Sequence, residues 1–307
     1  MKPIQPVVSI GMPVYNGEKF IRQAIESILS QTYQNLELII SDNASTDKTG
    51  EICRSYAAQD SRIRYTRNSK NLGAAKNFNK VFKLSTGMYF KWAAADNMIE
   101  PDYIEKCVNV LKSDTDAVMV YTQYKMIDVI HDRSWHSNLC FHLKSEDVFH
   151  RFNQAMSLAI GQNEIIWGLI RTDALLKTRL IDKYVGSDSC LLLDLVLKGK
   201  IIDIQEWLLT LRTHPDGFHA MKINFHENRW NRQRLYKERA QWFDTARSGR
   251  FFLPRWKILY EYIKIIIRSE VHAGLKIQMI VYCMKMINWE KKDLLEELKN
   301  AFNQVYC

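Results

Sequence analysis

The chain has 307 residues, 47% of them apolar, and carries a formal net charge of +9. A chain of this size and composition can bury a substantial core, which excludes a disordered or fibrous protein. The sequence contains no signal-peptide core, no uncharged apolar run of about 18 residues and no Cys-X-X-Cys pair among its six cysteines, so we expect a cytoplasmic protein with reduced thiols and no membrane-spanning helix.

The chain begins with a predicted strand, helix and second strand. The apolar run 7–12 ends at a proline, residues 17–31 repeat apolar side chains at helical spacing, and the run 36–40 ends in polar residues. Such a βαβ unit builds a parallel sheet, whose ligands bind outside the carboxyl ends of the strands. We therefore expect a ligand to meet the residues that follow the two strands, namely Pro13, Val14, Tyr15, Asn16 and Asp42.

Further elements follow in chain order up to residue 214. We predict helices at 49–59, 73–85, 100–111, after 145–147 and at 188–197, and strands at 63–66, 88–93, 117–124, 165–171 and 201–214. Residues 127–144 lose any period and predict a long surface loop. Beyond residue 214 the pattern predicts helices alone, at about 224–247, 254–268, 273–288 and 290–303, so we place a domain boundary there and expect an α/β domain at 1–214 and a helical region at 215–307.

Several motifs occur in a fixed order along the chain. They are the segment 9–47, Lys70-Asn71-Leu72-Gly73, the segment 91–97 followed by Pro101, and Gly186-Ser187-Asp188. Together they resemble the family 2 glycosyltransferases, strongly over 7–112, more weakly to about 214 and not beyond. The resemblance implies the GT-A fold, a Rossmann-like and mostly parallel sheet flanked by helices, and inverting transfer of a sugar from a nucleoside-diphosphate sugar to an acceptor hydroxyl.

The resemblance also assigns a donor site. Asp42 and residues 13–16 are expected to hold the base and ribose, although an aspartate after a strand also begins turns. Asn71 and Lys76 are expected near the diphosphate, although basic residues at a helix start are often merely solvated. Ala95 and Asp96 are expected to meet the sugar diphosphate.

A divalent cation, Mg²⁺ or Mn²⁺, is implied as the cofactor. Asp96 is its first expected ligand, and His214 of an Arg-X-His segment is the second, although a lone histidine before a proline is often a surface residue. Asn97 stands where the family usually carries another carboxylate, and an amide oxygen binds a cation more weakly.

Asp188 is the expected catalytic base, by resemblance. A carboxylate at a helix start also serves as a cap, and Asp194 on the same helix is a weaker alternative base. Trp135, in the polar segment, is the expected acceptor-side aromatic residue, whereas Trp92 and Trp167 lie in apolar runs and are expected in the core.

The predicted reaction is hexosyl or N-acetylhexosaminyl transfer, from a UDP-sugar as the first expectation to a glycan or lipid-linked acceptor, in glycan or cell-surface polysaccharide synthesis. One alternative is a nucleotidyltransferase, although the usual glycine-rich loop after the first strand is missing. The other is a nucleotide-sugar-binding protein without turnover, which only Asn97 favours.

The basic residues are concentrated in the C-terminal region. Residues 215–307 carry a net charge of +7 and residues 1–214 only +2. The stretch 254–268 combines lysines and arginines with an apolar stripe at helical spacing, which fits a helix lying on the inner face of an anionic membrane. The same stripe fits packing on the catalytic domain or on a second subunit of a homo-oligomer. No nucleic-acid motif accompanies the charge, and no nucleic-acid partner is expected.

Overall fold

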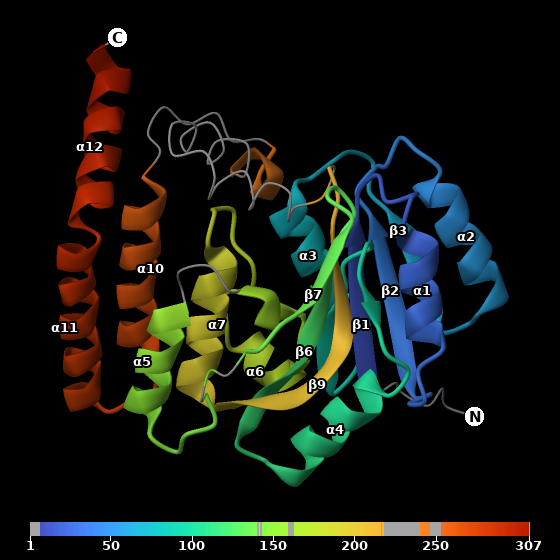
Figure 1. The fold of residues 1–307 in the computed structure, drawn as a ribbon, viewed down its shortest axis with the longest axis horizontal. Coiled ribbons are helices and arrows are strands. Elements are labelled where there is room, and N and C mark those ends of the chain that lie inside the picture. Colours follow the sequence, from blue (N-terminus) through green and yellow to red (C-terminus); the bar gives the residue numbers. More distant parts are fainter. Residues whose placement is uncertain are drawn as a thin grey trace.

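The computed structural model describes residues 7–139, 141, 143–158, 163–215, 217, 240–245 and 253–306. Within these residues a nine-stranded sheet has helices on both faces, and a further group of helices stands beyond α5 and α7, on the side away from β1 to β3 (Figure 1).

The first half of the chain alternates strands and helices, as predicted. Its elements are β1 (Val8–Val14), α1 (Ile21–Leu29), β2 (Leu36–Asp42), α2 (Thr49–Gln59), β3 (Ile63–Arg67), α3 (Ala74–Lys83), β4 (Tyr89–Trp92), β5 (Met98–Ile99) and α4 (Tyr103–Ser113). The second half holds β6 (Ala117–Asp128), β7 (Arg133–His136), α5 (Val148–Leu158), the 3₁₀ helix η1 (Asn163–Trp167), β8 (Leu169–Arg171), α6 (Thr172–Leu176), α7 (Ser187–Lys198) and β9 (Lys200–Thr213). The C-terminal helices are α10 (Pro254–Arg268), α11 (Ala273–Trp289) and α12 (Lys291–Tyr306).

The sheet is parallel where the βαβ pattern predicts it. Its order is β3-β2-β1-β4-β8-β6-β9-β5, with β7 paired to β6. Strands β3, β2, β1 and β4 run parallel, β8 is antiparallel to β4 and β6, and β9 returns parallel to β6. Because Val14 pairs with Asp42 in the β1–β2 register, the ends of these strands and the loops after them meet at one edge.

Helices cover both faces of the parallel strands, which explains why β1 and β2 are buried along their whole length. α1, α2 and α4 pack on one face, and α3, α6 and α7 on the other. α3 approaches β1 closely at Gly11, where an added Cβ would lie 2.7 Å from side-chain atoms of Val81 and Phe90. A side chain at this position would push α3 away from the sheet.

The helix predicted at 254–268 forms with those bounds as α10, and it packs against the rest of the protein. Tyr262 and Ile266 are buried in a core cluster shared by α5, α7, α10 and α11. Ile258 lies so close to Gly186, before α7, that a Cβ there would be 2.5 Å from its Cδ1. The apolar stripe of α10 is thus used in packing. The packing alternative is confirmed for this helix, and a membrane contact of the C-terminal region stays a prediction.

Two local predictions need correction. The predicted loop 127–144 contains the end of β6 and all of β7, whose four side chains are all exposed; a strand exposed on both faces has no alternating pattern. The predicted strand 165–171 is the 3₁₀ helix η1 followed by the short strand β8, because periodicity does not distinguish short apolar runs.

The predicted helix at 224–247 lies mostly outside the described residues. The helices predicted at 273–288 and 290–303 form as α11 and α12. No helix in the described part of the chain combines the length and hydropathy needed to cross a bilayer.

Candidate functional site

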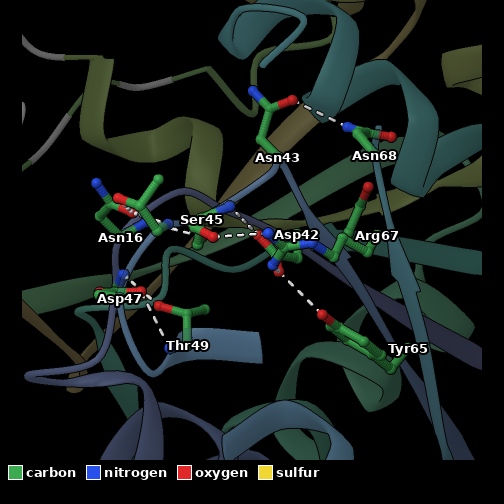
Figure 2. Close-up of polar contacts among 12 residues, drawn as sticks. Asn16, Asp42, Asn43, Ser45, Asp47, Thr49, Tyr65, Arg67 and Asn68 are labelled. Atoms are coloured by element: carbon green, nitrogen blue, oxygen red, sulfur yellow. Dashed lines mark hydrogen bonds and ion pairs between the residues drawn. The ribbon is translucent and has the colours of Figure 1, made fainter. Parts of the chain in front are cut away.

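Two loops at the carboxyl edge of the sheet are tied into one unit. Asn16, after β1, has φ of 51°, donates its backbone N–H to Ser45 Oγ at 2.9 Å and accepts from Thr46 N at 2.8 Å through its side-chain oxygen (Figure 2). The backbone N–H of Gly17 donates to Thr49 Oγ1 at 2.8 Å. Of the predicted ligand residues, Asn16 is therefore fixed in place by the second loop. Pro13 and Val14 are buried in β1, whereas Tyr15 is exposed.

Asp42, at the end of β2, is fully buried and held by three donors. Its Oδ1 accepts from Ser45 N at 2.8 Å, and its Oδ2 accepts from Tyr65 OH at 2.9 Å and Arg67 Nη1 at 2.6 Å (Figure 2). The Asp42 charge raises the pKa of the Arg67 guanidinium, and burial together with the Asp42 carboxylate raises the pKa of Tyr65. Asp42 thus makes the turn contact considered above, and a ligand that binds it must share or displace one of these donors. Sequence reasoning missed Tyr65 and Arg67, which β3 supplies.

A chain of buried amides joins β2 and β3 to α3. Asn43 accepts from Asn68 Nδ2 at 2.9 Å and donates to Asn71 Oδ1 at 2.8 Å, and Asn68 Nδ2 also donates to Asn77 Oδ1 at 3.1 Å. Asn71, predicted near the diphosphate, thus belongs to this network. Lys76 on α3 is exposed. Sequence reasoning missed the amide chain; its only signal is Asn77, a polar residue on the apolar face of a helix.

Asp96 and His214, predicted as cation ligands, meet at the same edge. Asp96 Oδ2 lies 3.1 Å from His214 Nε2, and both side chains are largely buried, with exposed fractions of 22% and 12%. Arg212 Nη1 donates to the backbone carbonyl of Asp96 at 3.0 Å. Burial lowers the pKa of Arg212, while the charge of Asp96 acts in the opposite direction. The turn that carries Asp96 is thereby fastened to the end of β9.

Phe20 completes this cluster from the start of α1. Its ring centroid lies 4.8 Å from that of His214, and the Arg212 guanidinium lies 5.0 Å above the same ring. Sequence reasoning placed Phe20 on the apolar face of a helix, and only the fold brings it to His214. An aromatic ring between an arginine and a histidine restricts the orientation of both side chains.

The pair of side chains fits a divalent cation. Two neighbouring ligands of an octahedral cation with bonds of about 2.1 Å lie about 3 Å apart. The hydrogen-bond distance of 3.1 Å between Asp96 Oδ2 and His214 Nε2 is compatible with that separation. No group of three or more His, Cys, Asp or Glu side chains that could hold a metal occurs among the described residues. The remaining ligands would therefore be water and phosphate oxygens, an arrangement that suits Mg²⁺ or Mn²⁺.

The neighbours of Asp96 in its turn differ in their surroundings. Ala95 is half-buried. Asn97 is buried, and its Oδ1 has no hydrogen-bond partner in the part of the chain that the structure describes. Asn97 lines a cavity of about 10 Å³ together with Lys91 and Trp167. This amide thus borders an interior cavity, and a contribution to a cation stays a prediction.

The predicted base lies in the first turn of α7. Asp188 is half-buried, and its Oδ1 accepts from Ser189 N at 3.0 Å. Burial raises the pKa of Tyr262 on α10, and the Asp188 charge adds to that effect. Asp194, the alternative base, pairs with Lys198 at 2.8 Å on the same helix, and burial raises its pKa. The role of Asp188 remains a prediction.

The burial of Trp92, Trp167 and Trp135 agrees with the prediction. Trp92 is fully buried, Trp167 packs partly buried against the core, and Trp135 on β7 is 45% exposed. The β6–β7 hairpin adjoins the candidate site, because Val129 N donates to Thr213 O at 2.9 Å, one residue before His214.

The family model described as "Glycosyl transferase family 2" matches residues 9–183. The chain belongs to glycosyl transferase family 2. Among curated proteins, this family 2 chain is 33% identical over 181 residues to a chondroitin synthase of Escherichia coli. The aligned segment covers 56% of this chain and 26% of that protein. It is 35% identical over 114 residues to glycosyltransferase GlyG of Streptococcus pneumoniae, which covers 37% of the chain and 38% of that protein. The chain thus spans less than half the length of either relative.

Solved structures show a similar fold. S. aureus TarS 1–349 in complex with UDP-GlcNAc has a TM-score of 0.66 at 13% identity, covering 98% of this chain and 82% of that one. Mannosyltransferase PcManGT from Pyrobaculum calidifontis, in complex with GDP-Man and Mn²⁺, has a TM-score of 0.53 at 16% identity, covering 99% and 85%. At these identities the likeness establishes the fold alone, and the predicted GT-A fold is confirmed.

Proposed function

We propose that this family 2 protein transfers a hexosyl or N-acetylhexosaminyl group from a nucleoside-diphosphate sugar to an acceptor hydroxyl, with inversion at the anomeric carbon. The convergence of Asp96 Oδ2 and His214 Nε2 at 3.1 Å carries this proposal. The two atoms lie beyond the carboxyl ends of the strands, where parallel sheets bind their ligands.

We assign Asp96 and His214 as protein ligands of a Mg²⁺ or Mn²⁺ ion. When bound, the cation would neutralise charge on the leaving nucleoside diphosphate. Arg212 orients this site, because it holds the Asp96 carbonyl and contacts the ring of Phe20. The Mn²⁺ named with the PcManGT structure supports a divalent cofactor.

The nucleotide is assigned to the joined loops after β1 and β2. Asp42 accepts hydrogen bonds there, and a buried carboxylate suits the ring N–H of uracil or guanine, or a ribose hydroxyl. Tyr15, Asn16, Asn71, Lys76 and Ala95 are assigned around the same donor. A UDP-sugar is the favoured donor, since TarS, the structure with the higher TM-score of the two, is described with UDP-GlcNAc, whereas PcManGT carries GDP-Man.

Asp188 is assigned as the general base. In this step the acceptor hydroxyl gives its proton to the Asp188 carboxylate, the acceptor oxygen forms a bond to the anomeric carbon, and the bond to the diphosphate oxygen breaks on the opposite face. The electron pair leaves with the nucleoside diphosphate, and inversion follows from the opposite-face attack.

The acceptor class proposed is a glycan or a lipid-linked glycan, as in polysaccharide synthesis. The similarity to a chondroitin synthase and to GlyG supports this class. We place the reaction in the cytoplasm, a location that the free, buried cysteines among the described residues (Cys53, Cys107, Cys190 and Cys283) fit.

A thermal-shift panel tests the donor assignment. UDP, GDP and CDP are added with and without Mn²⁺, and the correct diphosphate at 100 times its dissociation constant should raise the free energy of unfolding by about 2.7 kcal/mol. The Asp96→Asn variant should lose the increment that Mn²⁺ adds, and Asp173→Asn, at an exposed position on α6, should keep it. The proposal fails if no nucleoside diphosphate stabilises the wild type in either condition. Release of free sugar from the donor then separates an enzyme from a binding protein.

A further inference from the structure

The outer side of α11 is apolar. Ile277, Val281 and Met284 are 64%, 48% and 49% exposed, and their spacing of four and three residues places them on one face of the helix. We call these three residues the outer stripe. On the other side of the helix, Met279 and Cys283 are fully buried against α5 and α10. The helix is therefore apolar on both sides.

The packing of the described residues leaves the outer stripe uncovered. A surface helix normally turns charged and polar residues outward, and contiguous exposed apolar side chains mark an interaction surface. Figure 1 places α11 at the outer edge of the molecule, with α5 and α10 between it and the sheet. A flat partner can therefore reach the stripe without meeting the sheet.

Most acidic residues of the neighbouring helices are engaged within the protein. Glu261 on α10 is buried and pairs with Arg179, Lys257 and Lys264. Arg255 pairs with three acidic residues at the start of α12 or just before it: Glu290, Asp293 and Glu297. α11 itself contains no acidic residue. Few carboxylates of these helices thus remain unpaired and exposed.

The exposed charged side chains of α10, α11, α12 and the turns between them are mainly basic. No ion pair within the described residues engages the exposed basic side chains Arg268, Lys285, Lys291, Lys292 and Lys299. The exposed acidic side chains of the same helices and turns are Glu270 and Glu296. The outer stripe thus belongs to a group of helices whose exposed side chains carry a net positive charge, and Lys285 directly follows Met284 in α11.

We propose that the outer stripe of α11 docks on an anionic membrane surface, with the helix lying in the plane of the headgroups. The aliphatic side chains would enter the acyl boundary while the flanking lysines reach the phosphates. A second copy of this chain would bring two positive surfaces together and is disfavoured by like-charge repulsion. An anionic lipid surface complements both the charge and the apolar stripe.

Vesicle co-sedimentation of the full chain tests this proposal. Vesicles of phosphatidylcholine alone are compared with vesicles containing about 30% phosphatidylglycerol. The wild type should bind the anionic vesicles at least tenfold more tightly, and the difference should shrink as salt rises. Ile277→Glu and Met284→Glu, made singly and together, should lower binding to the anionic vesicles at least tenfold when combined. Leu176→Glu, at a 69% exposed position on α6, should not.

A charge variant separates the two parts of the surface. Lys285→Glu with Lys291→Glu leaves the outer stripe intact and should reduce binding severalfold at low salt and little at high salt. Every substituted side chain is exposed, so the variants are expected to fold. Unchanged melting curves would show that they do. The proposal is overturned if the wild type does not bind anionic vesicles at low salt, or if the Ile277→Glu and Met284→Glu variants bind them as tightly as the wild type. So does a dimer in sedimentation velocity that the stripe variants dissociate, because a second copy would then occupy the stripe.

Discussion

His214 Nε2 and Asp96 Oδ2 lie 3.1 Å apart although 118 residues separate them along the chain. β5 begins two residues after Asp96 and pairs with β9, which ends directly before His214, so that Met98 faces Thr210. The pairing of β5 with β9 brings the turn after β4 next to the end of β9. The hydrogen bond from Arg212 to the Asp96 carbonyl holds the turn in that position. The pair is therefore produced by sheet topology, and its geometry can be tested by breaking either half.

Asp96→Asn should remove the metal-dependent part of nucleotide binding. The amide keeps the size of the side chain but loses the charge that attracts a divalent cation. We expect the Mn²⁺-dependent affinity for the nucleotide to fall at least tenfold, about 1.4 kcal/mol, with metal-free binding unchanged. Titration calorimetry with and without Mn²⁺ measures both. His214→Gln should act in the same direction. An equal loss in both conditions would mean that Asp96 contacts the nucleotide directly.

Asp188→Asn should preserve donor binding and impair transfer. The amide oxygen can still accept from Ser189 N, so α7 should begin at the same residue, but the amide cannot take a proton from the acceptor. Transfer should fall by about 10² to 10⁴ if the carboxylate is the base. Asp194→Asn is the matched control on the same helix, since Asp194 already pairs with Lys198, and it should transfer at a near-normal rate. The opposite ranking of the two variants would move the role to Asp194.

The carboxyl edge of the sheet could be predicted from sequence because each strand and the polar residues that end it are neighbours in the chain. A buried strand followed by polar residues indicates where β1, β2 and β4 end, and thus points to Asp42 and Asp96. The partners of Asp42 could not be predicted in this way. Arg67 reaches Asp42 because β3 pairs with β2 in a register that sets these two residues opposite each other, and no local pattern reports a register between strands.

The C-terminal helices show a second limit of periodicity. The stripe in 254–268 correctly predicted α10, but an apolar face looks the same whether it meets protein or lipid. The close approach of Ile258 to Gly186 shows that this part of the α10 face meets protein. Conversely, α11 is apolar on two sides, so its exposed stripe becomes apparent only when Met279 and Cys283 are seen to be buried.

Asp42→Ala should lower the free energy of unfolding more than the loss of any one of the hydrogen bonds to Asp42. The substitution leaves Ser45 N, Tyr65 OH and Arg67 without their acceptor, and we expect a loss of about 2–3 kcal/mol, at the low end for a buried pair because Arg67 is 42% exposed. Tyr65→Phe removes one donor only and should cost about 1 kcal/mol. Urea unfolding of the two variants gives the comparison. If both variants lose the same amount, the ion pair with Arg67 contributes nothing measurable.

Lys91→Met should stabilise the protein most at low pH. Burial lowers the pKa of the Lys91 ammonium from its usual 10.5 to about 7, and Lys91 Nζ donates to the carbonyl of Trp167 and to Tyr103 OH. Between pH 7 and 10.5 the unfolded chain binds a proton that the folded chain lacks. The free energy of unfolding should therefore rise with pH across this window, by about 1.4 kcal/mol per pH unit for one group, and the penalty is complete below pH 7.

Methionine matches the length of lysine without its charge, so the variant should lose this rise. The free energy of unfolding of the variant should exceed that of the wild type near pH 6. This difference should shrink toward pH 9, because the buried lysine is then neutral in the folded wild type. The variant still lacks the hydrogen bonds to Trp167 and Tyr103, which lowers its free energy of unfolding by about 1–2 kcal/mol at every pH. Lys83→Met, at an exposed position on α3, is the control and should leave the pH profile unchanged. Urea unfolding at pH 6, 7.5 and 9 measures the three chains. A difference between Lys91→Met and wild type that is the same at all three pH values would show that Lys91 keeps its proton in the folded protein.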